Sequence, residues 1–193
     1  MLFVTPNGAT AGAATTLAPG AAVMLCPTIG PADVERITVR LAAGLFHVST
    51  RQGDGARTKR VNNLLCAANM AVAAEAVALA QRIGLDAQQT LAVINQSSGQ
   101  SWVGADRMAR ALAGDFAPRA HCTLLAKDSA LAMALAMAGQ AGITPVLGGQ
   151  AAATFQAALD AGFAAEDDAR LLSLVQRRWA AAAPASPAAP AAD

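Results

Sequence analysis

The residues with the clearest potential for chemistry lie between positions 53 and 63, where the sequence reads GDGARTKRVNN. The two glycines indicate a turn, and an uninterrupted helical pattern follows them as far as position 82. On that helix Lys59 and Asn63 are four residues apart, so their side chains share one face. A lysine amine can move a proton to or from a substrate oxygen while an amide orients that oxygen. The same pair is also common on solvated helix faces, so the spacing by itself leaves both interpretations open.

The composition indicates which elements must position these side chains. Apolar residues make up 54% of the 193 residues, aromatic residues only 4%, and Ala alone is more than a quarter. Alanine has the highest helix propensity, and its small side chain lets helices approach closely. The sequence predicts helices over residues 57–82, 86–95, 102–113, 121–138, 145–162 and 166–179. The predicted fold class is therefore mainly α.

The first 50 residues follow a different pattern. Short β-type runs occur at 2–5, 21–26 and 45–49, and a helical pattern from Pro31 to Gly44 lies between the last two. This order predicts a fragment of an α/β sheet. One helix cannot cover both faces of such a sheet, so we expect further elements of the same domain to precede residue 1.

Charge and metal-ligand content exclude several classes of function. The 14 basic residues balance 13 acidic ones, so the chain lacks the excess of positive charge expected for binding nucleic acid or an anionic membrane surface. The three cysteines are far apart and only two histidines are present, so we expect no metal site. Neither a signal peptide nor a continuous apolar span of membrane length is recognised in the uncharged stretches 1–32 and 129–159. We expect a cytoplasmic protein without a membrane or nucleic-acid partner.

The wider pattern around the lysine resembles a known family. Gly53-x-Gly55-x-x-x-Lys59-x-x-Asn62-Asn63 is similar to the catalytic-lysine motif of the β-hydroxyacid dehydrogenases, the group of 3-hydroxyisobutyrate dehydrogenases and tartronate semialdehyde reductases. Other segments resemble family motifs in the same order: Ala74-Glu75-Ala76, Ser98-Gly99-Gln100-Ser101-Trp102, Phe116 to Lys127-Asp128, and Glu166-Asp167-Asp168. The stretch 95–119 is most similar to the L-threonate dehydrogenase-like branch. The resemblance covers about residues 5–178.

The resemblance implies a fold, a reaction and a set of site residues. The fold would be an all-helical C-terminal dehydrogenase domain after a truncated α/β segment, and the reaction a hydride transfer between NAD(P) and a small 3-hydroxy acid or four-carbon sugar acid. Lys59 would be the general acid/base. Substrate-binding residues would be Asn63, Gly8, Trp102 and Phe116, and cofactor-binding residues Lys127 and Asp128. Without the resemblance, Trp102 and Phe116 fit core anchors equally well, and the Lys127–Asp128 pair fits an exposed ion pair.

The sequence departs from the family at two places. The family's Ser-Gly-Gly substrate loop aligns with Pro6-Asn7-Gly8, and proline offers neither a hydroxyl nor an N–H. No GxGxxG occurs in the 193 residues, although that loop holds the pyrophosphate in dinucleotide-binding folds. The resemblance implies NAD or NADP as cofactor. We nevertheless expect neither to bind this chain alone, which we interpret as an N-terminally truncated member of the family.

The sequence therefore predicts three parts: a remnant of a dinucleotide-binding domain at 1–54, a helical substrate and dimerisation domain at 55–179, and a disordered Ala/Pro tail at 180–193. One hypothesis is the C-terminal part of an oxidoreductase. The alternative is a non-catalytic remnant that acts only as a helical dimerisation module. Imine reductases share this fold but usually replace the lysine, so Lys59 argues against them. The Ala-rich helix at 57–82 and the apolar segment 129–138 predict a homodimer or higher homo-oligomer.

Overall fold

The computed structural model describes residues 2–4, 23–25, 54–137 and 141–181. The contacts divide the chain into two units, Met1–Asn62 and Asn63–Asp193, which are described separately. The expected strand at 45–49, the expected helix from Pro31 to Gly44 and the predicted substrate residue Gly8 lie outside the described residues. Most of the predicted tail, from residue 182 onward, also lies outside them.

The first unit contains two short strands, β1 (Leu2–Val4) and β2 (Val23–Leu25). They pair in parallel, with Leu2 opposite Val23 and Val4 opposite Leu25. A parallel pair requires a crossover connection between its strands, which is the arrangement of an α/β sheet. These are two of the three predicted strands, and their parallel register agrees with the predicted α/β fragment.

The long helix α2 (Asp54–Arg82) begins three residues earlier than the sequence pattern predicts. Gly55 lies inside its first turn rather than in a preceding loop. The Asp54 carboxylate accepts a hydrogen bond from Arg57 Nη1 at 2.7 Å, and an acidic residue is favourable at the positive end of the helix dipole. This local pairing explains why the helix extends through a glycine.

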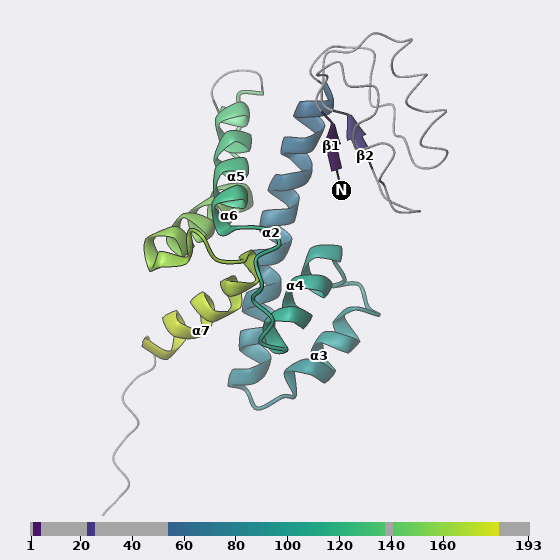
Figure 1. Cartoon of the computed structure of the whole chain (residues 1–193), viewed down its shortest axis with the longest axis vertical. Coiled ribbons are helices and arrows are strands. Elements are labelled where there is room, and N and C mark those ends of the chain that lie inside the picture. Colours follow the sequence, from purple (N-terminus) through teal and green to yellow (C-terminus); the bar gives the residue numbers. More distant parts are fainter. Residues whose placement is uncertain (1, 5–22, 26–53, 138–140, 182–193) are drawn as a thin grey trace, which may run out of the picture. The chain divides into compact units, whose positions relative to one another are not determined.

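Five further helical segments follow in the second unit (Figure 1), and most of their ends agree with the sequence pattern. They are α3 (Ala87–Ile94), α4 (Trp102–Leu112), α5 (Cys122–Met137), α6 (Val146–Ala158) continued by a π-helical turn (Leu159–Phe163), and a 3-10 turn (Asp168–Arg170) that leads into α7 (Leu171–Ala181). Asp86 caps α3 as predicted, because its side chain accepts a hydrogen bond from the backbone N–H of Gln89. Gly114 has a φ of +71°, which ends α4 where a glycine is favoured.

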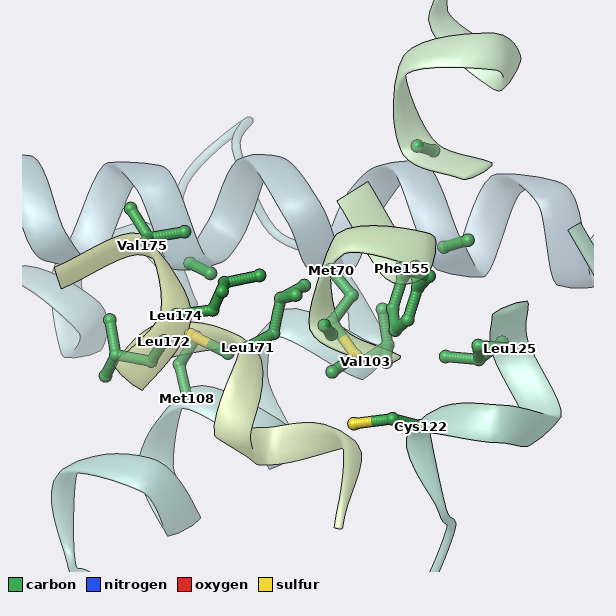
Figure 2. Packing of buried hydrophobic residues seen from close by; sticks show 14 of the residues in the cluster. Met70, Val103, Met108, Cys122, Leu125, Phe155, Leu171, Leu172, Leu174 and Val175 are labelled. Atoms are coloured by element: carbon green, nitrogen blue, oxygen red, sulfur yellow. The ribbon is translucent and has the colours of Figure 1, made fainter. Parts of the chain in front are cut away.

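The helices of the second unit share one apolar core. In the chain, α3 packs with α4 and α5 packs with α6. Figure 2 shows side chains from α2, α4, α6 and α7 meeting there, among them Met70, Met108, Phe155 and Leu171, all fully buried. Close approach depends on small residues: a Cβ at Gly148 would lie only 3.1 Å from Leu64 and Met133 side-chain atoms. The Ala- and Gly-rich sequence is therefore used for tight helix packing, as predicted.

One face of α2 is not covered in the single chain. The exposed face of α2, which we define as Leu65, Val72, Leu79 and the directly following Ile83, has side chains that are 49 to 64% exposed. By length and composition this helix is also apolar enough to cross a membrane. A third of its most apolar 18-residue segment is buried inside the protein. The central helix of a soluble domain meets the same criteria, and the opposite face of α2 contributes Ala67, Met70, Ala74, Val77 and Ala78 to the core.

Candidate active site

The predicted substrate residue Asn63 contacts a residue that is 65 positions further along the chain. Its Nδ2 donates a hydrogen bond to Asp128 Oδ2 at 2.6 Å, between α2 and α5. Because a carboxylate only accepts hydrogen bonds, this contact fixes which side of the Asn63 amide faces α5. The structure therefore brings together two of the residues that the family resemblance selects.

Asp128 lies in a largely buried stretch of α5. Leu125, Ala126 and Ser129 are buried, and Ser129 Oγ donates a hydrogen bond to the Leu125 carbonyl oxygen at 2.6 Å. The Asp128 side chain retains only 15% exposure. A short hydrogen bond from a neutral donor to a partly buried carboxylate is stronger than one between neutral groups, so the α2–α5 contact is well defined.

Lys127 lies beside this pair and points to solvent. Its Nζ is 3.8 Å from Asp128 Oδ1, and 62% of its side chain is exposed. We expected Asp128 to be the partner of Lys127, and the structure shows Asn63 as the closer partner. Lys127 is thus an exposed cation at the edge of the Asn63–Asp128 contact, available to an anionic or polar ligand.

Lys59 lies on α2 one helical turn before Asn63, and its side chain is partly exposed. The helix is continuous through both positions, so the predicted spacing of one turn is present in the backbone. Its role as general acid/base stays a prediction.

The two predicted aromatic residues occupy different surroundings. Trp102 is the first residue of α4 and is 78% exposed, with the Arg107 guanidinium 6.0 Å from its ring centroid. Phe116 follows α4 in a loop, and the Arg170 guanidinium lies 3.8 Å above its ring. The place of both residues at the substrate stays a prediction.

A buried charge cluster is the feature that sequence reasoning missed. Asp167 and Asp168 are both almost fully buried, and each pairs with an arginine of α4. Arg107 Nε lies 2.6 Å from Asp168 Oδ1, and Arg110 Nη2 lies 3.0 Å from Asp167 Oδ1. Asp167 also caps the 3-10 turn, because its side chain accepts a hydrogen bond from Ala169 N at 3.0 Å. Its larger role is to neutralise buried arginines.

The two carboxylates have opposite pKa shifts. Burial raises the pKa of Asp168 to about 6, aided by the charge of Asp167 and opposed by Arg107. Burial would also raise the pKa of Asp167, but hydrogen bonds from backbone N–H groups and from Arg110 outweigh it and lower that pKa to about 2. Arginines one turn apart on α4, in a chain with few charges, were the available signal for this cluster.

The described residues offer limited means of holding a cofactor or metal. In the ranges 54–137 and 141–181, together with the two short strands, no group of three or more His, Cys, Asp or Glu side chains is arranged to hold a metal ion. The exposed Lys127 could contact one end of a dinucleotide. Its pyrophosphate requires a loop that the 193-residue sequence does not contain.

Comparison with known proteins identifies the family. A family model described as the NAD-binding part of NADP-dependent 3-hydroxyisobutyrate dehydrogenase matches residues 53–175. The chain belongs to this family. The match begins at the glycine before α2 and ends within α7, so it includes the helices that carry Lys59, Asn63 and Asp128.

Individual relatives agree with the family. The chain is 32% identical over 167 residues to an L-threonate dehydrogenase from Cupriavidus necator, covering 84% of this chain and 55% of that protein. It is 26% identical to an L-threonate dehydrogenase from Escherichia coli, covering 84% of this chain and 68% of that one. The chain thus spans about half to two thirds of the length of these relatives.

Solved structures give the same result. A 3-hydroxyisobutyrate dehydrogenase from Salmonella typhimurium superposes with a TM-score of 0.66 at 26% identity, over 83% of this chain and 72% of that one. A 3-hydroxyisobutyrate dehydrogenase from Mycobacterium tuberculosis, solved with L-serine, gives 0.62 at 26% identity, over 76% of this chain and 53% of that one. The predicted family and the predicted all-helical C-terminal dehydrogenase domain are confirmed.

Proposed function

We propose that this chain is the substrate-binding and proton-transferring part of an NAD(P)-dependent dehydrogenase of small hydroxy acids. The observation that supports this most is the 2.6 Å hydrogen bond between Asn63 and Asp128, which joins two family-motif residues across α2 and α5. The proposed substrate is a four-carbon sugar acid or a related 3-hydroxy acid, because similar chains are named L-threonate dehydrogenases.

In this proposal each residue has a separate task. Asn63, held by its hydrogen bond to Asp128, binds and orients the substrate. Lys59, one turn earlier, takes the proton of the substrate hydroxyl as the alcohol is oxidised and returns it in the reverse direction. Lys127 contributes positive charge beside the site. When bound, the nicotinamide group accepts or supplies the hydride.

The test uses a protein in which residues 53–193 follow the nucleotide-binding half of the Cupriavidus necator relative. L-threonate should be oxidised with formation of NADH or NADPH. Lys59→Ala should lower kcat by roughly 10²–10⁴-fold, the usual contribution of general acid/base catalysis. The neighbouring Arg60→Ala is the matched control and should retain turnover. If kcat of the Lys59→Ala protein is within about three-fold of the parent value, Lys59 is not the general acid/base and only lies on a solvated helix face.

A second function is favoured by the exposed face of α2. The side chains of Leu65, Val72, Leu79 and Ile83 recur at intervals of seven, seven and four residues, which places them along one side of the helix. A row of exposed apolar side chains is a typical contact surface between subunits. We propose that a second copy of the chain covers it, so that the helical domain is a homodimer with or without catalysis.

Light scattering across a dilution series tests the dimer. The wild-type chain should have the mass of a dimer, and Val72→Glu, at the middle of the stripe, should shift it toward the monomer. Glu75→Gln is the control, because Glu75 is exposed on the same helix and adds no charge when changed. A wild-type monomer at high concentration would contradict the proposal.

A further inference from the structure

The start of α5 is tied to the buried carboxylate Asp167. Asp167 Oδ2 accepts hydrogen bonds from the backbone N–H groups of Arg119 at 2.7 Å and Ala120 at 3.3 Å. Two backbone bonds reinforce this contact: Asp168 N donates to Ala120 O at 2.8 Å, and Cys122 N donates to Glu166 O at 3.0 Å. The segment that enters α5 is therefore fixed by 166–168, and Asp128 lies six residues after the helix begins.

The same cluster also lies near α2. Cys66 is three residues after Asn63 on that helix, and burial followed by the nearby charge of Asp168 raises the pKa of its thiol. Cys122, the first residue of α5, is fully buried, and burial followed by Asp168 raises its pKa to about 12. Asp168, the neighbour of Asp167 in the chain, thus acts on a thiol of each of the two helices that form the Asn63–Asp128 contact.

The position of Asp167 is in turn set by α4. Arg110 is only 7% exposed, and its Nη2 contacts Asp167 while Nε lies 3.6 Å and Nη1 3.9 Å from the carboxylates of Asp115 and Asp106. No hydrogen-bond partner is recorded for Nε or Nη1 among the described residues. Nη2 also donates a hydrogen bond to the Ala117 carbonyl oxygen at 3.1 Å. Asp167 is the carboxylate nearest to this buried guanidinium, and the pairing favours one arrangement of α4 and 166–168.

We propose that Asp167 is a positioning residue for the candidate active site, which fixes the start of α5 through the backbone of Arg119 and Ala120 and so holds Asp128 against Asn63. Asp167 does not contact Asn63 or Asp128 itself and acts through the chain between Arg119 and Asp128. The inference rests on the proposed role of Asn63 in substrate binding, but its test does not depend on catalysis.

The test follows the side-chain amide signals of Asn63 by NMR in the isotope-labelled 193-residue chain. A proton in a short bond to a carboxylate should resonate well downfield of the other Asn amides. Asp128→Ala supplies the reference for loss of that bond. Asp167→Asn should move the Asn63 signals most of the way to this reference while the helical circular dichroism of the chain is retained.

The matched control is Glu166→Gln. It removes the half-exposed Arg170–Glu166 ion pair at 2.5 Å from the same segment and leaves the bonds to Arg119 and Ala120 in place, so the Asn63 signals should not move. If Asp167→Asn does not fold, Arg110→Lys, which keeps the charge but displaces the donor, should shift them in the same direction. Asn63 signals at the wild-type position in the folded variant, or equal shifts in Glu166→Gln, would overturn the proposal.

Discussion

The acid sensitivity of Asp167 gives a quantitative test of the buried cluster. The pKa of Asp167 falls from its ordinary 3.8 to about 2 in the folded chain. At roughly 1.4 kcal/mol for each pKa unit, its ionisation stabilises the folded state by about 2 kcal/mol. Because the folded pKa is the lower one, this contribution is complete above the unfolded pKa and is lost as the pH falls from about 4 to about 2.

The substitution that tests this is Asp167→Asn, which is close in shape but cannot be charged. At about pH 6 it should lower the free energy of unfolding by roughly 3–5 kcal/mol, because it leaves the buried Arg110 without its closest carboxylate. In acid the wild-type Asp167 also becomes neutral. The difference between the two proteins should therefore shrink by about 2 kcal/mol between about pH 4 and about pH 2.

Urea unfolding followed by circular dichroism at a series of pH values measures both quantities. The window below about pH 4 isolates Asp167, since the nearby Asp168 takes up its proton at about pH 6. Glu166→Gln is the control, and as a half-exposed pair it should cost no more than about 1 kcal/mol. If the difference in free energy of unfolding between wild type and Asp167→Asn stays constant from about pH 4 to about pH 2, the pKa of Asp167 is not lowered in the folded chain.

Three further predictions concern the same domain. The raised pKa of Asp168 means that its charged form opposes folding, so wild-type stability should rise as the pH falls from about 7 to about 4, and Asp168→Asn should abolish that rise in the same unfolding titration. Phe155→Ala should cost roughly 3–5 kcal/mol in urea unfolding, because Phe155 is fully buried, whereas Phe116→Ala, in a loop, should cost clearly less. Titration calorimetry of the 193-residue chain with NAD or NADP should show no micromolar binding, and such binding would contradict the inference from the missing pyrophosphate loop.

Much of the helical fold could be read from local sequence. Asp86 and Gly114 mark the start of α3 and the end of α4 because a capping side chain and a residue with positive φ act within a few residues of each other. The start of α2 was predicted three residues too late, since the Asp54–Arg57 pair compensates for Gly55 in the first turn. Errors of this size are typical where a weak local preference opposes a single ion pair.

The candidate site was also only partly predictable from the sequence. The motif around Lys59 selected Asn63, and the separate Lys127-Asp128 segment selected Asp128. Sequence alone did not show that these two residues contact each other, because the hydrogen bond joins positions 65 residues apart. Likewise, nothing local distinguishes the exposed Trp102 from a buried anchor, and its exposure depends on how α4 packs.

The sequence by itself determined the presence and order of the helices, the Ala-rich packing and the family, because capping, helix propensity and motif spacing are properties of neighbouring residues. The tertiary structure alone decided which charges are buried together. Arg107 and Arg110 appear as ordinary surface residues in the sequence, as does the acidic run that contains Asp167 and Asp168. They become one neutralised cluster only when α4 packs against the start of α7, because removal from water makes each charge dependent on its partner.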